Sequence, residues 1–353
     1  MKIGIPTEIK ILEGRVALVP EAVKELVKLN HQVFIQQGAG KLSGYNDQAY
    51  QIAGATIVKN AETLYGESGL IVKVKEPLPA EFDFLRQDHI LFSYLHLAAE
   101  LNLMKHLLAV GITAIAFETV EVNGALPLLT PMSDIAGRLS IQIGTHLLHA
   151  PQGGKGILLG GLPAAKRGNV VVLGAGVAGG NAASVAAALG SNVTVFDKKH
   201  DKLTEMRMLG PNVTALHPYS QSIEEAVQQA DLLIGAVLIP GAPAPVLVTK
   251  EMVSTMEPGS VIIDIAVDQG GCIETIHSTT YQQPTYLQQE VIHFGVANMP
   301  GAVPYTASQV LSSVIMPFVA EIADNQWKNN PALVSGVNVA DGEVKHSGLD
   351  GLV

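Results

Sequence analysis

The stretch Asn169–Asp197 reads NVVVLGAGVAGGNAASVAAALGSNVTVFD, and it carries the strongest fold signal in the chain. Its first part, Val170–Leu173, is a β-branched run typical of a buried parallel strand. Gly174, Gly176 and Gly179 then follow in G-x-G-x-x-G spacing. In this pattern the first glycine makes a tight turn, the second lets the backbone approach a pyrophosphate, and the third lets a helix pack closely on the strand.

The residues after the glycines complete a strand–helix–strand unit. The Ala-rich segment Val177–Leu189 favours a helix that ends at Gly190, and its N-terminus would direct N–H groups toward phosphates. The strand Val193–Phe196 leads into Asp197, 18 residues after Gly179. An acidic residue there accepts hydrogen bonds from a ribose 2′-hydroxyl and repels a 2′-phosphate, which predicts NAD rather than NADP. The nearby lysines weaken this preference: Lys198, Lys199 and Lys202.

Composition limits the class of protein. The 353 residues are 48% hydrophobic and 15% charged, which is typical of a globular chain long enough for two domains. The net charge of −10 argues against nucleic acid or an anionic membrane surface as a partner. Cys272 is the only cysteine, which fits a reducing cytoplasm. The most apolar long window is the helix after the glycines, and Asn181 and Ser184 interrupt it, so no membrane span is predicted.

The first part of the chain predicts a second doubly wound parallel sheet, because strands alternate with helical stretches. A helix is expected from Pro20 to about Leu29, and Thr130–Ser133 is expected to be a loop that ends in an N-cap, Ser133. No fingerprint glycines precede a helix here, which favours a substrate domain. The strands expected are Lys2–Ile5, Val33–Gln36, Ile71–Val74, Ile90–Tyr94 and Thr113–Phe117.

The helix that follows Ser133 is predicted to lead out of the first domain, since it carries an apolar stripe at four-residue spacing. The glycine-rich segment Ala150–Gly168 fits a hairpin, a domain hinge or a subunit contact, and the pattern does not choose among them. Four more strands are expected after the fingerprint unit: Val213–Ala215, Leu232–Ala236, Val261–Ile265 and Ile292–Val296. With the first two they make the six strands of a full dinucleotide-binding sheet.

A long helix over about Tyr305–Lys328, kinked at Pro317, should return the chain to the first domain, and a hairpin turning at Asp341–Gly342 should follow. The prediction is therefore an α/β protein of two Rossmann-like, doubly wound parallel-sheet domains with a cleft between them. The expected substrate domain is discontinuous, 1–128 plus 306–353, and the NAD-binding domain is 129–305.

Three basic residues of the first domain are candidates for binding and proton transfer. Lys75 and His96 each follow a predicted strand, and the carboxyl ends of parallel strands share one edge of a sheet. Arg15 is suited to clamp a carboxylate, Lys75 to add a point charge, and His96 to exchange a proton near neutral pH. Solvated surface charges and a hydrogen-bonded loop histidine are the ordinary alternatives.

The loops after the last three predicted strands lie where open parallel sheets bind ligands. One of them carries Ala266, Val267 and Asp268, and Asp268 is a candidate to bind an ammonium group or relay protons; a turn aspartate is the alternative. Asp264, inside the strand, is interpreted as structural. His146 and His149 lack an evident third ligand, so no metal is predicted, and Cys272 is expected to be a buried thiol.

Taken together, these motifs resemble the alanine dehydrogenase family over essentially the whole chain. The resemblance is carried by MKIGIPTEIKILEGRVALVP from Met1, VKVKEP around Lys75 and YLHLA around His96. TPMSDIAGR, VVLGAGVAG, IDIAVDQGGC and VANMPGAVP continue it in order. The resemblance implies NAD-dependent, reversible deamination of L-alanine to pyruvate and ammonium by a cytoplasmic homohexamer.

The resemblance also implies roles for single residues. Arg15 and Lys75 would bind the substrate carboxylate, His96 would act on the carbinolamine oxygen, and Asp268 would be the second proton carrier. One position departs from the family, because His277 stands where an arginine often contacts the cofactor. The predicted NAD contacts are Ser133, Gly174, Gly176, Val177, Ala178, Gly179, Asp197, Lys202, Ser220, Leu238, Ile239, Ala266, Val267, Val296, Ala297, Asn298 and Met299.

Three other functions share parts of this motif set. The nearest is the nucleotide-binding subunit of a proton-translocating transhydrogenase, which works with a membrane partner. A related lysine-forming or ornithine-type dehydrogenase and a non-catalytic sensor of the NAD redox state are the others. An assay of NADH formation with different amino acids distinguishes them.

Overall fold

A computed structural model describes residues 1–237 and 244–353 of the chain. By their internal contacts the described residues divide into two compact units, which we treat separately. Unit 1 comprises 1–132 and 303–353, and unit 2 comprises 133–302. The sequence-based boundaries were 128/129 and 305/306, within four residues of these divisions.

Unit 1 is built on a mixed sheet in the order β15-β14-β6-β5-β4-β1-β2-β3. The strands are β1 Lys2–Ile5, β2 Gln32–Gln36, β3 Thr56–Val58, β4 Leu70–Val72, β5 Ile90–Ser93, β6 Thr113–Ala116, β14 Val337–Ala340 and β15 Glu343–Val344. From β3 to β6 all pairs are parallel, and β14 joins β6 antiparallel. The predicted strands are confirmed with ends shifted by up to two residues, while the edge strand β3 was missed because only one of its three residues is buried.

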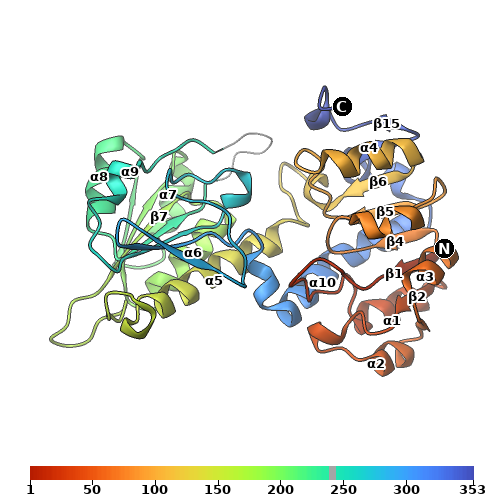
Figure 1. Cartoon of the computed structure of the whole chain (residues 1–353), viewed down its shortest axis with the longest axis horizontal. Coiled ribbons are helices and arrows are strands. Elements are labelled where there is room, and N and C mark those ends of the chain that lie inside the picture. Colours follow the sequence, from red (N-terminus) through yellow and green to blue (C-terminus); the bar gives the residue numbers. More distant parts are fainter. Residues whose placement is uncertain (238–243) are drawn as a thin grey trace. The chain divides into compact units, whose positions relative to one another are not determined.

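The helices of unit 1 cover this sheet (Figure 1). They are α1 Pro20–Lys28, α2 Asp47–Ile52, α3 Ala61–Glu67, α4 Leu101–Val110, α10 Pro304–Ala323 and α11 Pro331–Ser335. Pro20 opens α1 as predicted, because a proline in the first turn has no N–H to leave unsatisfied. The hairpin at Asp341–Gly342 is also confirmed, and both turn residues have positive φ angles of 54° and 76°.

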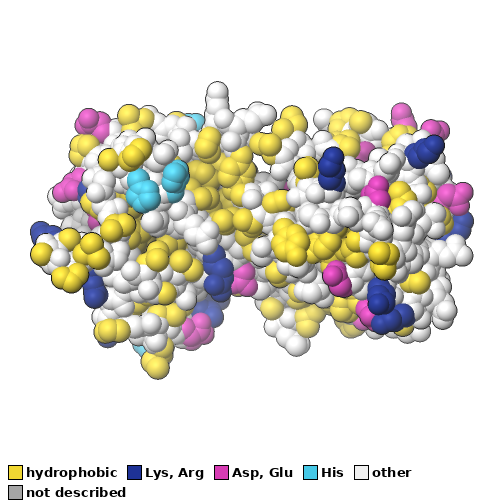
Figure 2. Space-filling view, turned by 90° about the horizontal axis from the view of Figure 1, so that it is seen from below, with side chains coloured by type: hydrophobic (Ala, Val, Ile, Leu, Met, Phe, Trp, Pro, Cys, Tyr) yellow, Lys and Arg dark blue, Asp and Glu magenta, His cyan; other side chains and the backbone are white. Residues whose placement is uncertain are grey.

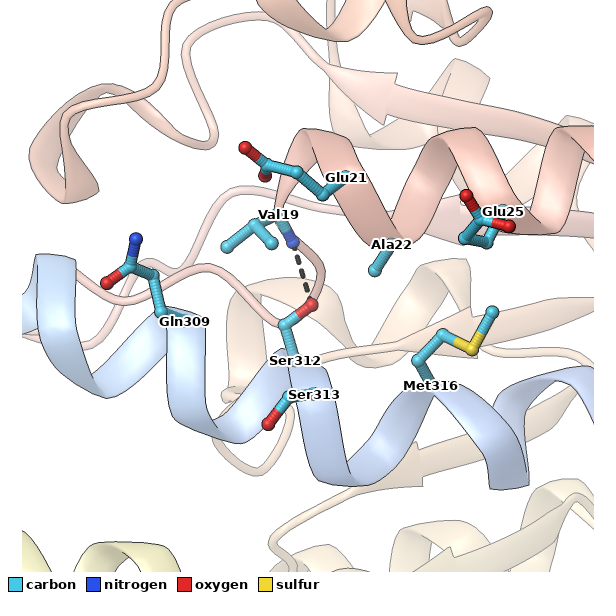
Figure 3. A pocket seen from close by; sticks show the side chains of 8 residues that line it. All are labelled: Val19, Glu21, Ala22, Glu25, Gln309, Ser312, Ser313 and Met316. Carbon is cyan, nitrogen blue, oxygen red and sulfur yellow. Dashed lines mark hydrogen bonds between the residues drawn. The ribbon is translucent and has the colours of Figure 1, made fainter.

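The long helix α10 is joined to the start of the chain by buried hydroxyl groups. The N–H of Val16 donates to Ser308 Oγ at 2.9 Å, and the N–H of Val19 donates to Ser312 Oγ at 3.0 Å. Figure 3 shows the second bond and the shallow groove that α1 and α10 form beside it. By length and composition α10 is the one described helix that is long and apolar enough to cross a membrane. These contacts identify α10 as a helix that packs within unit 1.

Unit 2 contains a sheet in the order β12-β13-β11-β10-β7-β8-β9. The strands are β7 Asn169–Leu173, β8 Asn192–Phe196, β9 Val213–Leu216, β10 Leu232–Gly235, β11 Val261–Asp264, β12 Thr285–Gln288 and β13 Val291–Phe294. The helices are α6 Val177–Ala188, α7 His200–Arg207, α8 Ser220–Gln228 and α9 Lys250–Val253. Six parallel strands form the predicted dinucleotide-binding sheet, and β12 adds an antiparallel edge.

The helix α5 (Thr130–Leu147) contains the division between the units and corrects one prediction. Ser133 was expected to be an N-cap after a loop, but α5 already begins at Thr130. Pro131 explains the difference, because proline fits the first turn of a helix without loss of a hydrogen bond.

Candidate functional site

The candidate substrate residues of unit 1 lie at the carboxyl edge of its sheet. Because β1, β4, β5 and β6 run parallel, the residues that follow them meet at one edge, and the order of connection reverses between β1 and β4. Lys75 follows β4 and His96 follows β5. The sheet ladder continues past the strands, since the N–H of Tyr94 donates to the carbonyl of Val74 at 3.2 Å. The topology therefore brings Lys75 and His96 to neighbouring positions, as the sequence predicted.

Arg15 is buried and held by a carboxylate of the same loop. Its Nε donates to Glu13 Oε1 at 2.7 Å, and its NH2 group donates to Glu13 Oε2 at 2.5 Å. Its NH1 group also contacts the sulfur of Met132 at 3.1 Å. Burial acts against the charge of Arg15, but the bonds to Glu13 raise its pKa above the ordinary value. Glu13 thus orients a permanently charged guanidinium.

Lys75 lies in the electrostatic field of Arg15. Burial, followed by repulsion from Arg15, lowers the pKa of the Lys75 ammonium below the ordinary value. Repulsion between two cations is relieved when an anion binds between them. The pair is suited to a ligand carboxylate, which would relieve the repulsion.

His96 adopts a backbone conformation that is rare for a residue with a side chain. Its φ is +48°, and such left-handed backbone is concentrated at functional sites. The carboxylate of Glu118 stabilises it, because Oε1 accepts from the N–H of His96 at 2.6 Å and from that of Leu95 at 3.1 Å. The same oxygen lies 3.8 Å from His96 Nδ1, and the Tyr94 ring stacks parallel to the imidazole at 5.9 Å. The imidazole remains 37% exposed, so it is oriented and still accessible to a ligand.

A second buried cluster supports the strand that carries Lys75. Lys73 Nζ donates to Glu81 Oε1 at 2.8 Å and lies 3.3 Å from Glu8 Oε2. Glu8 Oε1 accepts from the N–H of Val74 at 2.6 Å. Burial raises the pKa of Glu8, whereas the two carboxylates raise the pKa of Lys73 in spite of burial.

Sequence reasoning missed Glu8 and Glu118, although the signal that found Lys75 applies to both. Each follows a parallel strand, β1 and β6 respectively, and each is a charged residue at the same sheet edge. Glu13 had no such signal, because only the folded loop brings its carboxylate back onto Arg15.

The fingerprint glycines of unit 2 behave as the spacing predicts. Gly174 has a φ of +95°, and a Cβ there would lie 2.7 Å from the carbonyl oxygen of Ala236. A Cβ on Gly179 would lie 1.8 Å from the carbonyl oxygen of Gly174, so α6 packs too closely for any side chain. A Cβ on Gly176 would meet none of the described atoms within 4 Å. The second glycine therefore presents bare backbone, as close approach of a pyrophosphate requires.

The start of α6 has the properties of a phosphate site. Its N-cap is Gly176, which has no side chain to accept from the first-turn N–H groups. The acid at the end of β8 lies next to this loop, because Asp197 accepts from the N–H of Ala175 at 2.7 Å and from that of Lys199 at 2.8 Å. A helix N-terminus without a side-chain cap beside a terminal acid fits the pyrophosphate and ribose of NAD.

Most of the other predicted cofactor residues lie at the carboxyl edge of the same sheet. Val177 and Ala178 open α6, Ser220 opens α8 and Ala266 follows β11. Val267 is in the next turn, Val296–Met299 follow β13, and Lys202 is on α7, where it donates to Glu205. Ser133 is inside α5. The predicted contacts Leu238 and Ile239 lie outside the described residues.

The loop that carries Asp268 is a 3₁₀ turn, Val267–Gln269, directly after β11. Asp268 is exposed on it, whereas Asp264 and Cys272 on either side are buried. Cys272 is buried, as predicted, and burial raises the pKa of its thiol well above the ordinary value.

The other histidines singled out in the sequence are His146, His149 and His277. The rings of His146 and His149 pack edge to face at 5.9 Å, and no group of three or more metal-ligating side chains converges among the described residues. His277 stacks on Tyr286 at 3.7 Å, and its N–H donates to the Tyr286 hydroxyl at 2.9 Å.

Two family models together match most of the chain. Residues 4–136 match the family model described as alanine dehydrogenase/PNT, N-terminal domain, and residues 140–347 match the corresponding C-terminal domain. The chain is 48% identical to the alanine dehydrogenase of Bacillus subtilis (strain 168), covering 99% of this chain and 94% of that protein.

Two solved structures are similar over their whole length. An L-alanine dehydrogenase aligns with a TM-score of 0.95 and 50% identity, covering 98% of this chain and 97% of that one. A transhydrogenase from Sinorhizobium meliloti aligns with a TM-score of 0.86 and 26% identity, covering 98% and 99%.

Proposed function

The chain belongs to the alanine dehydrogenase/PNT family, and from that premise we propose that it catalyses the NAD-dependent, reversible deamination of L-alanine to pyruvate and ammonium. The observation that carries the proposal is the full-length match to alanine dehydrogenases at close to half identity. The glycine geometry of unit 2 and the basic residues of unit 1 agree with it.

In this proposal unit 1 binds the amino or oxo acid. Arg15 and Lys75 hold the substrate carboxylate, and the charge repulsion between them favours an anion at that position. Met132, which contacts the Arg15 guanidinium, brings an apolar surface beside the charged pair. Such a surface suits a short aliphatic side chain such as the methyl of alanine.

His96 and Asp268 are the proposed proton carriers. His96 takes and returns the proton of the carbinolamine hydroxyl, while the Glu118 carboxylate accepts from its backbone N–H and lies 3.8 Å from Nδ1. Asp268 carries the second proton in the exchange between carbinolamine, ammonium and oxo acid.

Unit 2 is the proposed nucleotide unit. When bound, NAD supplies the acceptor for the hydride that leaves the substrate Cα. The bare backbone at Gly176 and the N-terminus of α6 hold the pyrophosphate, and Asp197 accepts from the ribose hydroxyls. The same role is proposed for Val177, Ala178, Ser220, Ala266, Val267 and Val296–Met299, which lie at the same sheet edge.

A transhydrogenase subunit is the second candidate, favoured by the structural match to the Sinorhizobium meliloti protein. Its identity to this chain is 26%, against 50% for the L-alanine dehydrogenase, so the dehydrogenase is the better supported function.

We further propose that the protein is a cytoplasmic homohexamer. The segment Ala150–Gly168 supports a subunit contact, because Leu158 and Leu162 on it are 57% and 64% exposed. Figure 2 shows apolar side chains gathered at this end of unit 2. Charged replacements, Leu158→Glu with Leu162→Glu, should reduce the molecular mass measured by light scattering.

The test of the function is NADH formation, followed by absorbance, with L-alanine compared with serine, lysine and glutamate. We expect a rate with L-alanine that His96→Ala abolishes, while NADH binding followed by fluorescence persists. Absence of turnover with every amino acid would refute the dehydrogenase assignment. A rate with lysine exceeding that with alanine would redirect it to another amino-acid dehydrogenase.

A further inference from the structure

The side chain of Asp264 is a buried carboxylate, and its hydrogen-bond donors among the described residues come from one loop. Oδ1 accepts from the N–H of Ala266 at 2.9 Å, and Oδ2 accepts from the N–H of Cys272 at 2.8 Å. The Cys272 thiol lies in the electrostatic field of this carboxylate. Ala266 and Cys272 are the first and last residues of the segment that contains Asp268. One side chain thus ties both ends of that loop together.

The neighbouring strand leaves space for this carboxylate. Gly235 of β10 pairs with Asp264 of β11, and a Cβ on Gly235 would lie 2.7 Å from the carboxyl carbon. Gly271, with a φ of +67°, comes similarly close, since its Cβ would lie 2.8 Å from Oδ2. Glycines on two sides therefore admit a polar group where an apolar side chain would ordinarily fill the core.

Burying a carboxylate is unfavourable unless hydrogen bonds compensate for the lost water. Burial accordingly raises the pKa of Asp264, and the two backbone N–H groups oppose that change. A hydrophobic residue in β11 would serve the core of unit 2 without this cost. Among the described residues, the hydrogen bonds that compensate Asp264 come from the Asp268 loop. We therefore expect the carboxylate to act by fixing the shape of that loop.

We propose that Asp264 is a positioning residue that holds the 266–272 loop in the conformation that presents Asp268 for proton transfer. The proposal rests on the proposed dehydrogenase function for its kinetic consequence, but the loop geometry itself does not depend on it. An amide in place of the carboxylate would keep one acceptor and set its NH₂ group against the other backbone N–H.

The first test is hydrogen–deuterium exchange on the full chain. Asp264→Asn should accelerate exchange at the amides of Ala266 and Cys272 by roughly tenfold or more, the loss expected for one charge-assisted bond. The matched control is Asp231→Asn in the same sheet, where the Asp231 carboxylate accepts from the N–H of Asn169 at 2.7 Å at the opposite end of β10. Unchanged exchange at Ala266 and Cys272 in Asp264→Asn would overturn the proposal, whether or not the chain turns over alanine.

The second test separates positioning from general stability by kinetics. Asp264→Asn should lower kcat about tenfold to a hundredfold, the range expected when a catalytic group is misplaced, with the KM for L-alanine changed less than twofold. In an Asp268→Asn background the same change should lower kcat no further. An equal loss in both backgrounds would overturn the proposal, as would an equal loss in Asp231→Asn. If the unmodified chain forms no NADH, the proposed function fails and the exchange result alone decides on Asp264.

If Asp264→Asn does not accumulate in folded form, Cys272→Ala provides the test. It removes the buried thiol beside the carboxylate and keeps the backbone N–H, so the loop amides should exchange roughly two to ten times faster. No change in exchange at Ala266 would then overturn the proposal.

Discussion

The glycine fingerprint allows a matched pair of substitutions that separates packing from ligand binding. In Gly179→Ala the new methyl would lie 1.8 Å from the carbonyl oxygen of Gly174, whereas ordinary contact begins near 3.4 Å. Helix α6 and strand β7 must therefore move apart, and both contacting parts are backbone. In Gly176→Ala the methyl meets none of the described atoms, and the φ of −68° suits alanine.

The magnitudes follow from this difference. Overpacking a close contact costs about 1–3 kcal/mol, and Gly179→Ala belongs at the upper end because no flexible side chain can yield. For a unit of this size, about 3 kcal/mol corresponds to a fall in Tm of about 6–12 °C. Gly176→Ala should change the free energy of unfolding by no more than about 0.5 kcal/mol. Its effect should fall on NADH affinity, about 5- to 150-fold, as for about 1–3 kcal/mol of steric conflict.

The assays are thermal unfolding without ligand and a fluorescence titration with NADH. A Tm loss in Gly176→Ala as large as that in Gly179→Ala would refute the distinct roles given to the two glycines. Unchanged NADH affinity in Gly176→Ala would refute the placement of the pyrophosphate at the N-terminus of α6.

Three further predictions concern unit 1. Lys75 binds a carboxylate only while it is charged, and burial and Arg15 lower its pKa. The KM for pyruvate should therefore rise with pH at values below the ordinary pKa of lysine. Lys75→Arg should move that rise to higher pH, and a KM that does not change with pH would contradict the role. Glu118→Gln keeps an oxygen for the N–H groups of Leu95 and His96 but loses the negative charge. The kcat should fall about two- to six-fold, as for the loss of a partly exposed ion pair, and the Tm should not change. An unchanged kcat would contradict an electrostatic role for Glu118. Ser312→Ala leaves the N–H of Val19 without its acceptor. Chemical denaturation should show that the free energy of unfolding falls by about 1–3 kcal/mol. No change would mean that water replaces the hydroxyl.

The fold was largely predictable because its signals are local. A β-branched run, the spacing of Gly174, Gly176 and Gly179, and a terminal acid specify a strand–helix–strand unit whose parts are adjacent in sequence. Two predictions failed, and each failure has a local cause. At Thr130 a proline one residue later favours a helix start over the expected N-cap at Ser133. Only Val58 of the edge strand β3 is buried, so β3 lacks the continuous apolar run that indicated β4.

Residue types and strand ends led to Lys75 and His96 from the sequence alone, because the carboxyl edge of a parallel sheet is implied by the order of its strands. The same rule was available for Glu8 and Glu118, but acidic residues after strands are too common to single out without their contacts. The left-handed backbone of His96 had no sequence signal, since a histidine adopts it only when surrounding bonds hold it there.

The sequence by itself determined the class of the protein: two doubly wound sheets, a dinucleotide fingerprint, and basic side chains at a strand edge. These are properties of spacing and residue type. Only the tertiary structure decided the support of each group, such as Glu13 on Arg15, Glu118 beneath His96, and Asp264 across the Asp268 loop. Such support depends on distances and angles between atoms of separate segments, and hydrogen bonds and buried charges gain or lose their energy within fractions of an ångström.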